Sequence, residues 1–116
     1  MILDSNISKL DPAWQSIVTN ICREIELSGD KYLDSMTVFG SVARSEANSA
    51  SDLDICLDYS CDIMDEDYVI DTNVVGAADI IRKNTNGNSD TLYKPLISGR
   101  LLDSIEKDGI VVYQKG

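Results

Sequence analysis

Segments with two different apolar periods alternate along this chain, and this alternation limits the folds open to it. In residues 11–27 apolar side chains recur every three to four positions, the period of a helix face, with Asp11 as an N-cap and Pro12 in the first helical position. Residues 53–57 instead alternate apolar and polar side chains with period two, as a half-buried strand does. The chain is therefore expected to pack helices on a sheet.

The remaining segments continue this alternation. The pattern predicts strands at 36–39, 90–93 and 110–113, helices near 70–83 and 97–108, a strand-to-helix corner at Gly40-Ser41 and a turn at 84–89. This order, without repeats or linkers, predicts an α/β (α+β) fold, a small mixed sheet of about four strands flanked by helices. The apolar side chains of the last strand, Val111, Val112 and Tyr113, are expected in the core rather than at an edge that pairs with another chain of a homo-oligomer.

Length and charge narrow the organisation and the partners. A length of 116 residues is typical of one domain, so residues 1–116 are expected to form a single domain. Ten Lys and Arg against 20 Asp and Glu give a formal charge of −10, which opposes broad binding to nucleic acid or to anionic membranes. No apolar run is long enough for a membrane span.

The absence of histidine restricts the chemistry. No imidazole is present to serve as a general base or a metal ligand, so catalysis must use carboxylates, hydroxyls or a metal. The three cysteines, Cys22, Cys56 and Cys61, are odd in number and lack a Cys-x-x-Cys spacing, and the first ten residues lack the apolar core of a signal peptide. A cytoplasmic protein with buried or idle thiols is expected.

Two aspartates at the start of the predicted strand 53–57 are the first candidates for a site. On a strand, residues two positions apart point to the same face, so Asp52 and Asp54 project together, about 6.5–7 Å apart along the backbone. Two carboxylates this close repel each other, and a divalent cation converts that repulsion into attraction. The pair therefore indicates a hard, oxygen-ligated metal such as Mg²⁺.

The corner at Gly40-Ser41 supplies groups for an anion. A glycine lets the backbone approach a phosphate closely, while the Ser41 hydroxyl and the first amides of a helix donate hydrogen bonds to its oxygens. Arg44 could place its guanidinium on a polyphosphate or on the carboxylates of the loop that follows. A Gly-Ser corner or an Asp-x-Asp pair is common alone. Together, Gly40-Ser41 and Asp52-x-Asp54 place a turn with groups for an anion close in sequence to carboxylates for a cation.

These residues resemble a known signature. Phe39-Gly40-Ser41-Val42-Ala43-Arg44 followed by Asp52-Leu53-Asp54 is similar to the motif of the DNA polymerase beta-like nucleotidyltransferase superfamily, in particular its minimal nucleotidyltransferase (MNT) branch. The resemblance extends over nearly the whole chain, with Asp90-Thr91-Leu92-Tyr93, an amphipathic helix and Ile110-Val111-Val112-Tyr113 in the order that minimal members show. The family often has a glycine after the arginine, where this chain has Ser45.

The resemblance implies roles for particular residues. Asp52 and Asp54 would hold two Mg²⁺ ions, and Gly40, Ser41 and Arg44 would contact the triphosphate of ATP. We choose Asp90 as the third carboxylate, because it opens the predicted strand 90–93 beside the Asp52-x-Asp54 strand; the alternative is a polar residue that closes the preceding turn. Four other acids are expected to face solvent from a helix or a loop: Asp58, Asp62, Asp71 and Asp79.

The implied reaction transfers AMP from ATP to a hydroxyl group, with release of pyrophosphate. MNT proteins that resemble this chain are often antitoxins that transfer AMP to a tyrosine of a HEPN-type toxin, which makes such a toxin the expected partner. Two alternatives stay open. One is a nucleotidyltransferase for a small molecule such as an aminoglycoside, and the other is an antitoxin that acts by binding alone.

Overall fold

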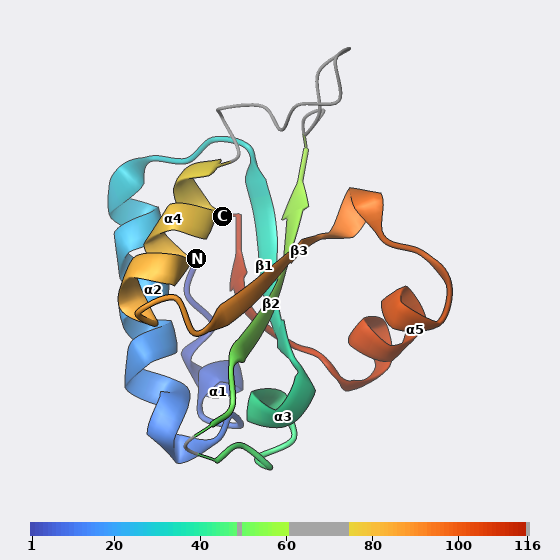
Figure 1. The fold of residues 1–116 in the computed structure, drawn as a ribbon. Helices are drawn as coiled ribbons and strands as arrows, with labels where there is room; N and C mark the ends of the chain where they lie inside the picture. The colour runs from blue at the N-terminus through green and yellow to red at the C-terminus, as the bar shows by residue number, and fades with distance from the viewer. Residues whose placement is uncertain (49, 61–74, 116) are drawn as a thin grey trace.

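The chain folds around one four-stranded mixed sheet (Figure 1). The computed structural model describes residues 1–48, 50–60 and 75–115. The strands are β1 (Leu33–Phe39), β2 (Leu53–Tyr59), β3 (Ser89–Tyr93) and β4 (Ile110–Gln114). The helices are α1 (Asp4–Ile7), α2 (Gln15–Ser28), α3 (Gly40–Ala43), α4 (Val75–Asn84) and α5 (Gly99–Asp108), with short 3-10 turns at Pro12–Trp14 and Lys94–Leu96.

The strand order is β3-β2-β1-β4, in which β1 pairs antiparallel with both β2 and β4, while β2 and β3 are parallel. The predicted α/β (α+β) architecture is therefore confirmed. The predicted turn at 84–89 is also present, with Asn86 and Gly87 in the left-handed region at φ 52° and 82°. Of the helix expected near 70–83, residues 70–74 lie outside the described residues, and α4 confirms the remainder.

The first long helix begins differently from the expectation. Asp11 accepts a hydrogen bond from the Ala13 amide at 3.0 Å, as an N-cap does, but the turn it caps is 3-10 and the α-helix starts only at Gln15. The helix ends at Gly29, which takes the left-handed conformation at φ 70° that closes many helices.

β1 and β2 extend more than one residue beyond the strands that the apolar alternation predicted. β1 begins at Leu33, which pairs with Tyr59, and a bulge separates Leu33 from Ser35. Because it pairs with β1, β2 continues to Tyr59. The expectation that Asp58 lies in a loop is therefore wrong, since Asp58 is a strand residue opposite Ser35. The antiparallel ladder between β1 and β2, which the alternation does not report, extends both elements.

The amino-terminal segment, for which the sequence predicted no element, covers the outer edge of β4. Leu3 donates its amide hydrogen to Val112 O at 2.9 Å, and Gln114 donates to Met1 O at 3.0 Å. α1 then packs beside β4. β4 thus lies at an edge of the sheet. Val112 and Tyr113 are buried as expected, but Val111 is only half-buried.

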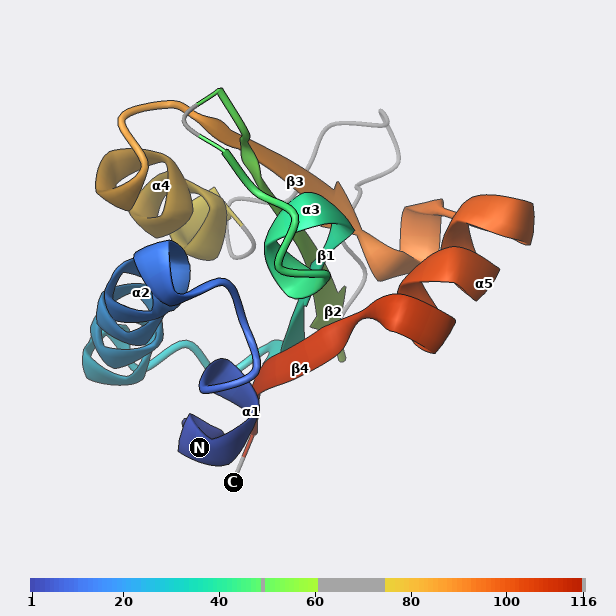
Figure 2. The ribbon, with the colours of Figure 1, turned by 90° about the horizontal axis from the view of Figure 1, so that it is seen from below.

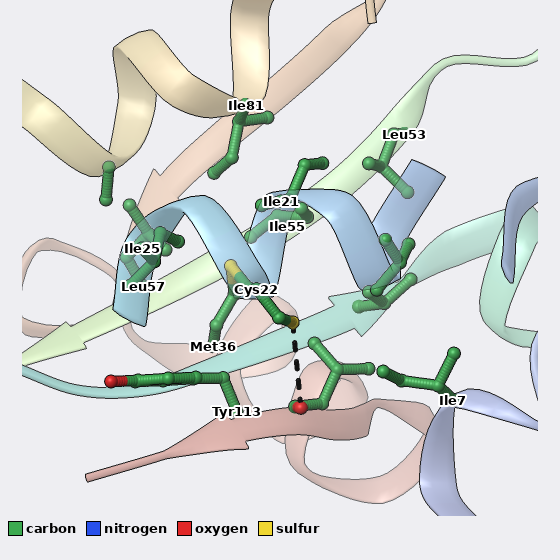
Figure 3. Packing of buried hydrophobic residues seen from close by; sticks show 14 of the residues in the cluster. Ile7, Ile21, Cys22, Ile25, Met36, Leu53, Ile55, Leu57, Ile81 and Tyr113 are labelled. Atoms are coloured by element: carbon green, nitrogen blue, oxygen red, sulfur yellow. Dashed lines mark hydrogen bonds between the residues drawn. The ribbon is translucent and has the colours of Figure 1, made fainter. Parts of the chain in front are cut away.

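The core lies between the sheet and one layer of helices. α2 and α4 cover one face of the sheet, and α5 lies on the opposite side (Figure 2). Figure 3 shows this core, where apolar side chains of α2 and α4 meet those of the strands: Ile21, Ile25, Ile81, Met36, Leu53, Ile55 and Leu57. Cys22 also belongs to it, with its thiol 3.8 Å from Val112 O. In the described part of the chain, no helix is both long and apolar enough to span a membrane.

The opposite face of the sheet, called here the open face, is only partly covered. In β2 the buried side chains alternate with half-buried Asp54 and Asp58, which places these two acids on the open face together with Cys56. α5 covers part of this face through Ile105, which is buried. The candidate site lies on the open face, at the end of the sheet near α3.

Candidate active site

The structure brings together the three aspartates that the sequence singled out. Asp54 lies in β2 and Asp90 lies directly beside it in β3, as a register pair of the parallel ladder. Asp52 immediately precedes β2 and lies close enough for its charge to affect the titration of Asp54. Asp52 and Asp90 are exposed and Asp54 is half-buried. The expected juxtaposition of Asp90 with the Asp52-x-Asp54 strand is confirmed.

Gly40 is fitted to Asp54. It has φ 72°, in the left-handed region that side chains rarely adopt, and it follows the last residue of β1, Phe39, which pairs with Asp54 across the sheet. A Cβ atom at Gly40 would overlap the Asp54 carboxylate and lie 3.2 Å from its Cγ atom. Glycine is therefore required at the strand-to-helix corner both for the turn and for the close approach of this carboxylate.

Partial burial and the neighbouring acids make the Asp54 carboxyl hard to ionise. Partial burial raises the pKa of its carboxyl above 3.8, and the negative charges of Asp90 and Asp52 raise it further, while Arg44 lowers it. A carboxylate in this position is stabilised by any cation that reaches it. The electrostatics of the site thus favour a positive ligand between these acids.

The segment after Gly40 forms a compact turn that is attached to the rest of the fold. Asp11 donates its amide hydrogen to Val42 O at 3.0 Å, and the Arg44 amide donates to Gly40 O at 3.1 Å. Arg44 itself is exposed and its Nε atom donates to Glu46 at 3.1 Å, so the structure shows it on a loop carboxylate, one of its two expected partners. Ser41 is half-buried in the same turn.

Ser45 takes a conformation that favours glycine. Its φ is 56°, in the left-handed region, where the resembling family often has a glycine. The turn therefore keeps a backbone conformation suited to glycine despite the serine.

Two of the four other acids, Asp58 and Asp79, lie among the described residues, and each lies near a basic side chain. Asp79 is exposed and paired with Arg82 in the same helix, as a solvent-facing residue should be. Asp58 lies on the open face, and its carboxylate is 4.0 Å from Lys94 Nζ. Asp62 and Asp71 lie outside the described residues.

Sequence reasoning did not find a pocket that lies farther along the open face. It has a volume of about 270 Å³ between the open face and α5, and Cys56, Asp58, Lys94 and Glu106 are among the residues that line it. Lys94 Nζ also approaches Glu106 at 3.8 Å. The period-two alternation from Asp54 to Asp58 could have placed Cys56 and Asp58 on this face, but no local signal could have placed Lys94, which follows β3. Burial raises the pKa of the Cys56 thiol to about 11, so this thiol is a weak nucleophile.

The donor chemistry of the aspartates fits Mg²⁺. Among the residues that the structure describes, no three acidic or cysteine side chains already converge as a metal cage. Mg²⁺ does not need such a cage, because it is commonly bound by one or two carboxylates, several waters and the phosphates of a substrate. The carboxylates of Asp54 and Asp90, on adjacent strand positions, are of this kind.

Comparisons with known proteins agree with this geometry. A profile of the family described as "Nucleotidyltransferase domain" matches residues 18–111. No curated protein matches the sequence.

Several solved structures share the fold at low sequence identity. A toxin–antitoxin crystal structure with AMP-PNP has a TM-score of 0.61 and 19% identity, over 83% of this chain and 74% of that chain. The MntA–HepT toxin–antitoxin structure has a TM-score of 0.53 and 18% identity, over 84% and 72% of the two chains. A complex of tri-AMPylated Shewanella oneidensis HEPN toxin with MNT antitoxin has a TM-score of 0.55 and 17% identity, over 85% and 73%.

Proposed function

Because this chain belongs to the nucleotidyltransferase domain family, we propose that it transfers AMP from ATP to a hydroxyl group of a partner protein, in a reaction that depends on Mg²⁺. The observation that carries the proposal is the arrangement of Asp54, which lies against Gly40 and beside Asp90. One strand-to-helix turn thereby presents groups for a phosphate next to carboxylates for a cation. We further propose that residues 1–116 form one domain and work in the cytoplasm.

Each residue has a defined task in the proposed reaction. The acceptor oxygen forms a bond to the α-phosphorus of ATP, the bond from that phosphorus to the bridging oxygen breaks, and pyrophosphate leaves with the electron pair. In this proposal Asp90 accepts the proton of the attacking hydroxyl. Gly40 and Ser41 hold the phosphates, and Arg44 can turn from Glu46 toward them.

Asp52, Asp54 and Asp90 would hold the Mg²⁺ ions. When bound, Mg²⁺ neutralises charge on the phosphate oxygens and orients the nucleophile. The raised pKa of Asp54 supports this assignment, because a cation offsets both the desolvation cost of burial and the repulsion from the neighbouring acids.

A HEPN-type toxin is the partner we propose, which makes this chain an antitoxin. Two of the structures with the same fold are of other proteins of that kind: one holds AMP-PNP and another is a complex with an AMPylated toxin. The formal charge of −10 suits a basic partner.

The test is transfer of label from ATP. The purified protein is incubated with Mg²⁺, a lysate of its source and ATP labelled at the α-phosphate, with γ-labelled ATP in parallel to exclude phosphorylation. We expect one small protein to acquire α-label, and Asp52→Asn or Asp54→Asn to reduce the labelling by about 100-fold or more, because outer-shell changes alone cost about 10- to 100-fold. Asp103→Asn, which removes one charge from an exposed position of α5, should leave labelling unchanged.

The alternatives predict different results. If the aspartate variants label the partner as well as the wild-type chain does, these residues do not carry the reaction. If no protein is labelled but the chain binds a partner, the result favours an antitoxin that acts on its toxin by binding alone. If label passes only to a small molecule, the acceptor is not a protein.

A further inference from the structure

The two edge strands of the sheet, β4 and β3, differ in whether another described segment pairs with their outer side. The outer edge of β4 is closed by residues 1–3, whose backbone pairs with Val112 and Gln114. At the other edge, β3 pairs with β2 on one side, and within the described ranges no strand lies on its other side. Unpaired strand edges are templates for the backbone of another chain. The open edge is also the one that carries Asp90.

The direction of the β3 backbone groups follows from one hydrogen bond. The Leu53 amide donates to Asn88 O at 3.0 Å, so the peptide groups of Asn88 point toward β2. Backbone groups alternate along a parallel ladder, and Asp90, two positions on and paired with Asp54, therefore also points its N–H and C=O toward β2. Thr91, the residue between the inward-pointing positions, presents its N–H and C=O at the outer edge.

This alternation decides where an added strand would place its side chains. A residue opposite Asp90 on an antiparallel strand would form a pair without hydrogen bonds, with Cα atoms about 4.5 Å apart, the closest approach of side chains on a sheet. Its side chain would lie on the same face as Asp90 and Asp54. A hydroxyl on that side chain would thus meet the carboxylates of the candidate site.

The neighbours of that residue would point to the other face of the sheet, where the structure has room for them. A hollow of about 240 Å³ lies along this side of β3, between the strand and α4. It is lined by Ala78, Arg82, Gly87, Ser89 and Thr91. Side chains that flank the hydroxyl-bearing residue can occupy this hollow.

From these observations we propose that the outer edge of β3 binds the acceptor as an extended peptide strand, with the hydroxyl-bearing residue opposite Asp90. The inference rests on the proposed function and names the form of its substrate. The transfer step is unchanged: the peptide hydroxyl bonds to the α-phosphorus, pyrophosphate leaves, and the proton passes to Asp90.

The charge of the chain favours a partner peptide over a second copy of this chain. Two copies that each carry a formal charge of −10 repel each other, and pairing of two β3 edges would add the Asp90 side chains of both to one face. A peptide with basic residues outside the paired segment is attracted instead.

The test uses three synthetic peptides of one sequence: eight residues with a tyrosine near the centre, valines beside it and lysines at both ends. The first is unmodified. The second is N-methylated on the two residues that flank the tyrosine, whose amides would face β3. The third is N-methylated on the tyrosine and on the residue two positions after it, whose amides would face away. AMP on each peptide is measured by mass spectrometry with Mg²⁺ and ATP.

We expect the third peptide to be modified as well as the first, and the second to be modified at least about tenfold less, because two backbone hydrogen bonds are lost. On the protein side, Thr91→Pro removes the outward amide without removing a bond to β2, since proline is tolerated where the amide of an edge strand faces outward. This variant should also lose at least about tenfold in peptide modification, while calorimetric binding of Mg²⁺-ATP reports whether its nucleotide site is intact.

Equal modification of all three peptides overturns the inference, as does full activity of a folded Thr91→Pro variant. Failure of the wild-type chain to modify any peptide overturns it too. In that case the lysate experiment distinguishes the two proposals, since labelling of an intact partner would leave the proposed function standing.

Discussion

At the scale of single residues, the site depends on close contact between Gly40 and Asp54. The sequence predicted the glycine for its approach to a phosphate, and the structure adds that the glycine also makes room for a carboxylate. The sequence could not predict that Gly40 makes room for the carboxylate, because Asp54 reaches Gly40 only when β1 and β2 pair with Phe39 opposite Asp54.

Substitution of Gly40 should therefore cost more than a left-handed backbone alone. Gly29 is a matched control, with φ 70° against 72° and no atom within 4 Å of the position that a Cβ would occupy. Gly29→Ala should lower the free energy of unfolding by about 1–2 kcal/mol. Gly40→Ala should lower it by about 1–3 kcal/mol more, the usual cost of overpacking. Urea unfolding of the two variants measures the difference, and equal losses would show that Asp54 moves aside freely.

The raised pKa of Asp54 leads to a second prediction. A carboxyl whose pKa is higher in the folded than in the unfolded chain binds more protons when folded, so its contribution to stability falls as pH rises from below 3.8 through the folded pKa. Asp54→Asn removes this penalty. In a buffer without divalent cations the variant should be more stable than the wild-type chain at pH 7.

The stabilities of the wild-type chain and the variant should converge as the pH falls below 3.8, the usual pKa of this group. Asp54 is then protonated and uncharged in both the folded and the unfolded chain. Unfolding midpoints in urea, measured from pH 3 to pH 8, follow the difference. Lower stability of the variant at pH 7 would mean that the Asp54 carboxylate makes a favourable interaction that outweighs its repulsion from Asp52 and Asp90.

At the scale of elements, the helices were predicted better than the strands. The apolar face of α2 is visible in the sequence because helix periodicity is local, and its residues Val18, Ile21, Cys22 and Ile25 are buried. The start of β1 and the end of β2 were missed because cross-strand pairing extends them. α1 was missed because it is only four residues long and is held by its contacts with β4.

The apolar face of α2 can be tested with two nearby residues. Ile25 is 1% exposed and Leu27 is 87% exposed, although both are large apolar residues of the same helix. Ile25→Ala should lower the free energy of unfolding by about 2–5 kcal/mol, as cavities in a core do. Leu27→Ala should change it by less than about 0.5 kcal/mol. Chemical denaturation gives both values, and similar losses would contradict the placement of α2 on the sheet.

At the scale of the whole molecule, net charge opposes the compact state. With 20 acidic and ten basic residues, the folded chain concentrates negative charge, and three of those acids lie together at the candidate site. Most of the ion pairs that the structure shows are exposed and contribute little. Repulsion among the acidic residues therefore acts over the whole folded chain rather than at one contact.

Salt should accordingly stabilise the protein. Raising NaCl from about 0.01 M to about 0.3 M shortens the screening length severalfold and weakens this repulsion. The thermal unfolding midpoint should rise across that range, and that of Asp103→Lys, at an exposed position of α5, should rise less because this variant carries less net charge. A midpoint that falls with salt would show that attractive ion pairs dominate.

The sequence by itself determined the α/β alternation, the helix faces and the spacing from Gly40-Ser41 to Asp52-x-Asp54, because periodicity and turn chemistry depend on neighbouring residues. Tertiary structure decided the rest: the strand order, the fit of Gly40 to Asp54, the pairing of Asp54 with Asp90, and an outer edge of β3 that no strand of the described ranges pairs with. These features join residues that are far apart in the chain. Pairing of the strands, in a sheet that packs against α2 and α4, brings them together.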